Sequence, residues 1–235
     1  MYTYSFEFYR PGKDYFSGNE FVDTLNKLRG LDFEIKFRPN DPHVDRKKGS
    51  IRFNPRERGL NVEVSREGRF MDLILGPADG KFGSIGLLAI DAEQFDYQFK
   101  SEQEKNAQIL SEGALAVFLG IKPIFAWGDH ELELDKLGDF LSFDRIGALA
   151  WNNFFSRELI EKLGGINKIL LHPESREERE RAQGILKEFQ LYSLNISDSP
   201  MEPVSPRIAM DCERRYPGAI IKSFEVHGKV IEISK

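Results

Sequence analysis

Three consecutive residues, Asp129, His130 and Glu131, combine an imidazole with two carboxylates and are the strongest candidates for chemistry in this sequence. Imidazole nitrogens and carboxylate oxygens suit zinc or iron, and either group can transfer a proton in catalysis. Adjacent side chains on an extended segment point in opposite directions, so three neighbours rarely bind one ion together. The competing interpretation is structural: Gly128-Asp129 forms a turn, and Asp129 or His130 caps a helix that begins at Leu132.

A fourth candidate is Asp91, which follows the continuous apolar run 85–90. Such a run is typical of a buried central strand. A carboxylate at the end of a strand can serve a hydrolase or a nuclease, and it can equally begin a loop or cap a helix. Asp91 and His172 are the plausible outside partners of the cluster at 129–131. No spaced motif such as H-E-x-x-H supports a metal site, so the sequence identifies neither a metal nor a cofactor.

Large aromatic side chains lie close to these polar residues in the sequence. Trp127 and Trp151 are the two tryptophans of the chain, and Phe154 and Phe155 follow the second. Tryptophan is over-represented among the residues that dominate binding interfaces, so the four could frame a pocket or a protein-binding surface. Such residues are more often simply packed core. An exposed patch around Trp127 and Trp151 would favour the binding interpretation.

Charge is unevenly distributed along the chain. The segment from Lys36 to Arg69 contains ten basic and five acidic residues, a net charge of +5, whereas the rest carries −10. Such asymmetry can indicate a surface for nucleic acid or another anionic partner. The alternative is a solvated hairpin region, because no glycine-aromatic signature is present and the rest of the chain would repel phosphate. The candidate patch for an anionic partner consists of Arg46, Lys47, Lys48, Arg52, Arg56 and Arg58.

The spacing of apolar residues predicts an α+β fold, with a mainly antiparallel sheet in the first half and helices packed on one face. Strands are expected at 2–9, 31–37, 60–65, 70–75 and 85–90, with a hairpin turn at 65–68. Helices are expected at 19–29, with Asn19 as the cap and Val22 buried, and at 102–120, 132–141 and 156–163. Segment 94–99 is expected to be a strand or an irregular edge, 193–206 a connection, and 219–233 a last hairpin.

The chain has 235 residues, enough to bury a sizeable core, and no linker divides it. One domain over 1–235 is expected, with a two-lobed layout, sheet-rich at 1–100 and helix-rich at 101–235, as the alternative. The one cysteine, Cys212, cannot form an intramolecular disulfide, and no signal peptide is visible. No apolar run approaches the ~20 residues that span a membrane. A cytoplasmic location without membrane contact is the expectation.

The segment Trp151–Leu171 combines an aromatic-rich turn, a short helix that ends at Gly164, and an apolar strand at 169–171. It resembles a stretch found in bacterial polymorphic-toxin immunity proteins. The resemblance implies a protein that folds and binds a partner without catalysis.

The function expected from the sequence is that of a non-enzymatic, cytoplasmic protein that binds another protein in an inhibitory or immunity-like role. One alternative is a metal-assisted hydrolase or nuclease that uses Asp91, Asp129, His130 and Glu131, with segment 36–69 holding an anionic substrate. A second alternative is a nucleic-acid-binding protein that uses the same basic segment, with an affinity that falls steeply as salt rises.

Overall fold

The computed structural model describes residues 2–11, 17–37, 44–45, 50–51, 60–76, 84–96, 99–131, 134, 150–162, 191–195, 220–223 and 229–232. The chain groups into two compact units, Met1–Pro123 and Ile124–Lys235. The single domain expected from the sequence, and its alternative boundary near residue 100, stay predictions. No helix in the described part of the chain is both long and apolar enough to cross a membrane.

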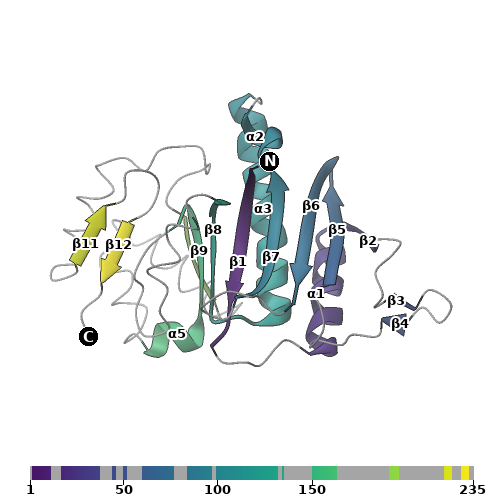
Figure 1. Cartoon of the computed structure of the whole chain (residues 1–235), viewed down its shortest axis with the longest axis horizontal. Coiled ribbons are helices and arrows are strands. Elements are labelled where there is room, and N and C mark those ends of the chain that lie inside the picture. The colour runs from purple at the N-terminus through teal and green to yellow at the C-terminus, as the bar shows by residue number, and fades with distance from the viewer. Residues whose placement is uncertain are drawn as a thin grey trace. The chain divides into compact units, whose positions relative to one another are not determined.

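The first unit is built on an antiparallel sheet with helices on one face (Figure 1). The strands of this unit follow the order β1 (Thr3–Tyr9), β7 (Ser84–Asp91), β6 (Arg69–Leu75), β5 (Leu60–Arg66) and β2 (Glu34–Phe37). The helices are α1 (Gly18–Gly30), the short α2 (Glu93–Asp96) and α3 (Lys100–Ile121), and a small pair joins β3 (Val44–Asp45) to β4 (Ser50–Ile51). The α+β fold with an antiparallel sheet is therefore confirmed.

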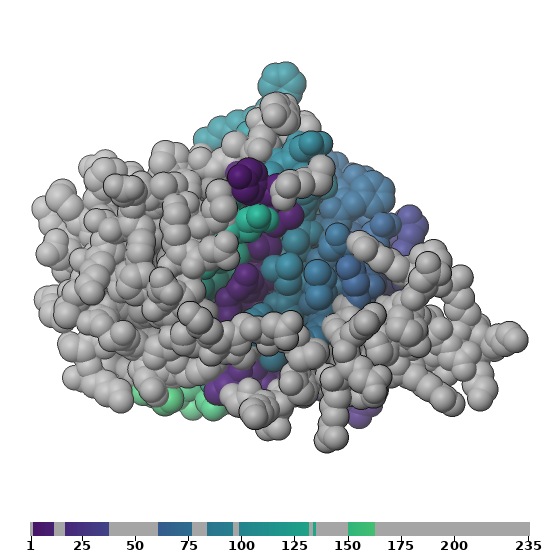
Figure 2. Space-filling model, viewed as in Figure 1, coloured from purple at the N-terminus to yellow at the C-terminus, as the bar shows by residue number. Residues whose placement is uncertain are grey.

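The core of this unit lies between the sheet and helices α1 and α3. Strand β1 buries Tyr4, Phe6 and Phe8, because alternate side chains of a strand point to the same face. On β7, Leu88 lies opposite Phe6 and is fully buried. A Cβ atom added at Gly113 of α3 would lie 3.1 Å from Leu88, which places this face of the sheet against the helix. Figure 2 views the other face, where atoms of β5 and β6 reach the surface.

Helix α1 is capped by Ser17, not by Asn19 as the sequence suggested. Ser17 Oγ accepts a hydrogen bond from Glu20 N at 3.2 Å, and Glu20 Oε2 accepts one from Ser17 N at 2.6 Å. This reciprocal capping box satisfies two backbone N–H groups at once and starts the helix at Gly18. The expectation that Val22 is buried was also wrong, since it is 49% exposed and Thr24 is buried instead.

Helices α1 and α3 approach most closely where Gly120 lies against Thr24. A Cβ atom at residue 120 would lie 2.5 Å from Thr24 Cα and 2.7 Å from Thr24 Cβ. Real Cβ atoms do not approach other carbon atoms so closely, so only glycine allows the two helices to pack at this distance. Thr24 Oγ1 also donates a hydrogen bond to Glu20 O at 2.8 Å, which fixes its rotamer.

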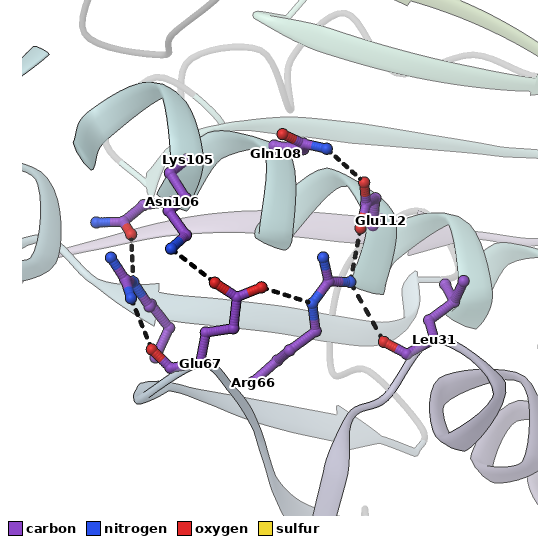
Figure 3. Close-up of polar contacts among 8 residues, drawn as sticks. Leu31, Arg66, Glu67, Lys105, Asn106, Gln108 and Glu112 are labelled. Carbon is purple, nitrogen blue, oxygen red and sulfur yellow. Dashed lines mark hydrogen bonds and ion pairs between the residues drawn. The ribbon is translucent and has the colours of Figure 1, made fainter. Parts of the chain in front are cut away.

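Strands β5 and β6 form the expected hairpin, closed by the two-residue turn Glu67-Gly68. Both turn residues are left-handed, with φ of 53° and 76°, as a tight hairpin turn requires. Ion pairs fasten this turn to α3 (Figure 3). Arg66 Nη1 lies 2.6 Å from Glu112 Oε2, and Lys105 Nζ lies 2.7 Å from Glu67 Oε2. The hairpin is therefore held to the helix by a side chain of β5 and by one in the turn.

Arg69 forms the other half of this attachment. Its Nε donates to Asn106 Oδ1 at 2.8 Å, its Nη1 donates to Glu67 O at 2.6 Å, and its Nη2 pairs with Glu102. Asn106 is buried and donates in turn to Gln94 O. Gln94 Nε2 donates back to Phe70 O on β6 at 3.1 Å. A continuous set of hydrogen bonds thus joins the hairpin, α2 and α3.

Arg66→Met is expected to lower the free energy of unfolding by about 1–2 kcal/mol, because charged hydrogen bonds in partly buried positions contribute this much. Besides its pair with Glu112, Arg66 Nη1 donates to Leu31 O at 3.3 Å, and the guanidinium lies 5.1 Å from the Phe33 ring centroid. The matched control is Arg157→Met, whose exposed pair with Glu161 at 2.7 Å should be worth under about 0.5 kcal/mol. Equal losses of unfolding free energy in the two variants, measured by urea denaturation, would contradict the attachment of the hairpin to α3.

The Glu67–Lys105 pair predicts a specific response to acid. The hydrogen bond and charge of Lys105 hold the pKa of Glu67 below its ordinary value of 4.5, and Arg66 and Arg69 lower it further. A carboxylate with a depressed folded-state pKa stabilises the fold above its unfolded-state pKa, and this contribution is lost as pH falls through the folded-state pKa. Between pH about 5 and about 3, the melting temperature of Lys105→Gln should therefore fall less than that of the wild type. Lys27→Gln is the control. If the melting temperatures of Lys105→Gln and wild type fall in parallel as pH is lowered, the Glu67–Lys105 pair makes no such contribution to stability.

The second unit contains the antiparallel strands β8 (Phe125–His130), β9 (Asn152–Ser156) and β10 (Leu191–Asn195), with β9 between the other two. Helix α5 (Arg157–Lys162) follows β9, and its first turn is capped by Ser156 Oγ, which accepts from Leu159 N at 3.2 Å. Strands β11 (Ile220–Ser223) and β12 (Lys229–Glu232) form the expected last hairpin. The helix expected at 156–163 is therefore present and begins directly after Ser156.

Three local predictions were wrong. Residues 152–156 form a strand rather than an aromatic-rich turn, because they pair with both β8 and β10. Residues 191–195 form a strand where a connection was expected from residue 193. Residues 93–96 begin a helix where a strand or an irregular edge was expected. The expected helix at 132–141 lies outside the described residues, apart from Leu134.

Candidate functional site

Asp129, the central residue of the chemical candidate, is buried in β8. Its Oδ1 accepts a hydrogen bond from His130 N at 2.8 Å, and its Oδ2 accepts one from Trp151 N at 2.7 Å. The expected turn at Gly128-Asp129 is wrong, because Gly128 pairs with Asn152 across the β8–β9 ladder. The carboxylate therefore anchors the backbone at the point where the chain enters β9.

Asn153 stabilises the same entrance to β9. Its Oδ1 accepts from Ala150 N at 2.9 Å, and its Nδ2 donates to Ala150 O at 2.8 Å. Both Asn153 and Ala150 are fully buried. Buried backbone groups need hydrogen-bond partners, and Asp129 and Asn153 supply them for two successive residues. This arrangement gives the polar residues a structural role that needs no ligand.

The other candidates for metal binding or catalysis are Asp91, His130, Glu131 and His172. Among the residues that the structure describes, no group of three His, Cys, Asp or Glu side chains could hold a metal ion. Asp91 belongs to the first unit, where its Oδ1 accepts from Glu93 N at 3.0 Å at the start of α2. His130 and Glu131 are half-buried at the end of β8, and His172 lies outside the described residues.

The four aromatic residues considered for binding are buried, with no side chain more than 3% exposed. They are Trp127, Trp151, Phe154 and Phe155. The ring of Trp127 lies 5.4 Å from that of Phe125, centroid to centroid, as in aromatic pairs of protein cores. Their burial fits the interpretation as packed core, and the patch expected around Trp127 and Trp151 is not exposed in this structure.

The patch expected for an anionic partner lies outside the described residues. Its members are Arg46, Lys47, Lys48, Arg52, Arg56 and Arg58. The basic residues of segment 36–69 that the structure does describe are paired within the chain. Lys36 Nζ lies 3.3 Å from Glu63 Oε1, and Arg66 and Arg69 pair with carboxylates of α3. These cations are therefore already neutralised by neighbouring side chains.

A different surface is exposed on the first unit, on the sheet face opposite the helices. Strand β6 buries Met71, Leu73 and Leu75 toward the helices, whereas Phe70 is 51% and Ile74 is 37% exposed on the other side. Large apolar side chains on a sheet face that helices leave open are unusual, because that face is normally polar. We call the surface over β2, β5 and β6 that contains Phe70 and Ile74 the open sheet face.

The strand register places the side chains of the open sheet face in rows. Ile74 lies opposite Asn61 on β5 and opposite Leu87 on β7, which gives an apolar pair between β6 and β7. The next row is charged: Asp72 lies opposite Glu63, and Glu63 lies opposite Lys36. Phe70 follows in the third row, and Lys36 Nζ lies 5.8 Å from its ring centroid. The open sheet face therefore combines exposed apolar side chains with charged ones.

The sequence carried a signal for this surface that the initial interpretation missed. In the β6 segment Arg69–Leu75, apolar residues occupy both parities: 71, 73 and 75 on one face, and 70 and 74 on the other. A strand with one solvated face should be polar at 70 and 74. The apolar residues at positions 70 and 74 were therefore the sign in the sequence that this strand has an exposed apolar surface.

Comparisons with known proteins identify no family. No family model matches the chain, and no curated protein matches it. One solved structure, the Pseudomonas aeruginosa T6SS protein PA0821, is similar with a TM-score of 0.39 and 7% sequence identity over 98% of this chain. The chain spans 64% of the length of that protein. A likeness of this degree carries no argument about fold, partner or function.

Proposed function

We propose that this chain binds another protein without catalysing a reaction, and that the open sheet face is its binding surface. The observation that carries the proposal is the exposure of Phe70 and Ile74 on the same face of β6. Exposed apolar side chains rimmed by polar ones mark interaction sites, and aromatic residues are enriched at the centres of interfaces. Burial of these two side chains by a partner would supply the apolar part of the binding free energy.

The attachment of the hairpin to α3 supports this proposal. Arg66 and Glu67 hold the β5–β6 hairpin against the helix through contacts drawn in Figure 3, and Arg69 holds it through a hydrogen bond to Asn106. The strand that carries Phe70 and Ile74 is therefore positioned before a partner arrives. A preorganised surface loses less conformational entropy on binding than a flexible one, which favours affinity.

We propose more specifically that binding inhibits the partner and takes place in the cytoplasm. The inhibitory role rests on the resemblance of Trp151–Leu171 to polymorphic-toxin immunity proteins. Strand β9 and helix α5 form the start of that segment, and residues 163–171 lie outside the described structure. A chain with one cysteine suits a reducing compartment, which supports the cytoplasmic location.

Affinity capture with surface variants tests the proposal. A tagged chain is used to capture proteins from cells that encode it, and bound proteins are quantified by mass spectrometry. Wild type and Val22→Ser should retain the same partner, because Val22 is equally exposed but lies on α1, on the helical side of the sheet. The double variant Phe70→Ser/Ile74→Ser should bind that partner at least about tenfold more weakly, as loss of interface anchors predicts.

The controls separate loss of binding from loss of fold. Melting temperatures of all the variants are compared, and only folded protein is used for capture. Retention of the partner by Phe70→Ser/Ile74→Ser at wild-type affinity would overturn the assignment of the surface. If wild type and Val22→Ser have no captured protein in common, the proposed function itself is wrong.

A further inference from the structure

We infer that Gln94 and Asn106 are positioning residues for Phe70, the aromatic anchor of the open sheet face. Neither residue belongs to that face, because Gln94 lies in α2 and Asn106 lies in α3. This inference rests on the proposed function and identifies what controls it. Partner binding then depends on Asn106, a buried side chain outside the binding surface.

The backbone carbonyl of Phe70 is held from α2. The register of β6 and β7 begins at Met71 and Ile90, so it ends one residue short of Phe70. Gln94 Nε2 donates to Phe70 O at 3.1 Å at this end of the ladder. A side chain of α2 thus supplies a donor to β6 beyond the last residue pair with β7. It fixes the peptide group next to the ring of Phe70, which is 51% exposed.

Gln94 is held in turn by Asn106. Asn106 Nδ2 donates to Gln94 O, and Asn106 Oδ1 accepts from Arg69 Nε at 2.8 Å. The carboxamide of Asn106 therefore bonds to both segments that meet at Phe70. One is Arg69, which precedes Phe70 in β6, and the other is Gln94, which holds the Phe70 carbonyl.

The chemistry of asparagine suits both hydrogen bonds of Asn106. A guanidinium only donates and a backbone carbonyl only accepts, so the side chain must offer an oxygen to Arg69 and an N–H group to Gln94. An aspartate lacks the donor, and a leucine lacks both groups. Asn106 is 3% exposed, and burial of a polar side chain is costly unless it is hydrogen-bonded. A fully bonded buried group favours one arrangement of the elements that it joins.

The position of Phe70 before binding affects affinity. A half-exposed ring is held less by packing than a buried one, so its orientation depends more on its backbone. Conformations that Phe70 samples in the free protein must be given up when a partner buries the ring, which weakens binding. Hydrogen bonds that fix the Phe70 carbonyl reduce those conformations in advance. Loss of Gln94 or Asn106 should therefore weaken binding without removing any atom from the contact surface.

The ¹³C chemical shift of the Phe70 carbonyl tests the inference in the full-length chain without the partner, because this shift responds to hydrogen bonding at the oxygen. We expect it to change in Gln94→Met, which removes the donor. We expect a change in the same direction in Asn106→Leu, although Asn106 does not bond to Phe70. The double variant should change the shift no further than the larger single change, because both substitutions act through one hydrogen bond.

Gly120→Ala is the control for general destabilisation. Residue 120 also lies on α3, about 20 Å along the helix from Asn106, and a methyl group there would meet Thr24 of α1. The Phe70 carbonyl shift of Gly120→Ala should stay that of the wild type, and melting temperatures establish that each variant is folded. If Asn106→Leu leaves the shift unchanged, or Gly120→Ala changes it as much, the inference is overturned.

Partner binding supplies the second measurement. The protein captured by both wild type and Val22→Ser should bind Gln94→Met and Asn106→Leu at least about threefold more weakly, as loss of one hydrogen bond of typical strength predicts. Capture that depends on Phe70 and Ile74 but is unchanged in these two variants would overturn this inference alone. Capture that does not depend on Phe70 and Ile74 would overturn the proposed function, and with it the positioning role, whatever the carbonyl shift shows.

Discussion

Gly120→Ala is expected to lower the free energy of unfolding by about 2–3 kcal/mol, the cost typical of overpacking a closely packed contact. The added methyl group would lie 2.5 Å from Thr24 Cα and 2.7 Å from Thr24 Cβ, and it would also meet Thr24 Oγ1. Two of these atoms belong to the backbone of α1 or are attached to it directly, so a rotamer change cannot relieve the clash. Helix α1 must move away from α3.

Gly30→Ala is the matched control for Gly120→Ala. Gly30 also lies in a helix of the first unit, and nothing lies within 4 Å of a Cβ atom built there. Alanine favours a helix over glycine by about 1 kcal/mol, so this variant should be as stable as the wild type or more stable. Urea unfolding followed by circular dichroism measures both variants, and hydrogen exchange should show faster opening of α1 in Gly120→Ala. Equal stability of the two variants would contradict the close helix contact.

Asp129→Ala is expected to cost about 2–4 kcal/mol, because hydrogen bonds to a charged group are strong and buried donors are costly to leave unpaired. The substitution removes the acceptor of Trp151 N at 2.7 Å and of His130 N at 2.8 Å. The entrance to β9 would lose its anchor, although Asn153 would still hold Ala150. Asp129→Asn keeps the shape and one oxygen acceptor, so it should lose less.

Tryptophan fluorescence is the right probe for Asp129→Ala, because both tryptophans lie in the second unit and Trp151 loses a hydrogen bond directly. The control is Glu161→Ala, which breaks an exposed ion pair on α5 in the same unit and should cost under about 0.5 kcal/mol. A stoichiometric transition metal in wild-type protein that disappears in His130→Ala would contradict the structural role of this cluster. It would make the metal-assisted hydrolase, an alternative until then, the better-supported function.

Local sequence patterns predicted much of the fold of the first unit. Strand β1 and the β5–β6 hairpin follow from alternating residues and a turn with glycine, and α3 follows from its long apolar half. These elements are determined by neighbours in sequence, so the pattern contains the information needed. The cap of α5 at Ser156 is local in the same sense.

The candidate site was harder to predict, because it depends on contacts between distant segments. Gly128-Asp129 has the composition of a turn, and only the pairing with β9 extends β8 through it. Trp127 and Trp151 are types found in both cores and interfaces, and burial alone distinguishes the two. The exposure of Phe70 and Ile74 depends on which face of the sheet α1 and α3 cover, which the sequence of β6 does not specify.

Photo-crosslinking from the open sheet face tests the central claim most directly. Benzoylphenylalanine is placed at position 70, where it preserves an aromatic ring, and at position 22 as the equally exposed control on α1. After irradiation of cells that encode the chain, the account predicts one dominant protein adduct from position 70 that is absent from position 22. No adduct at position 70, or the same adducts from both positions, would contradict binding through this face.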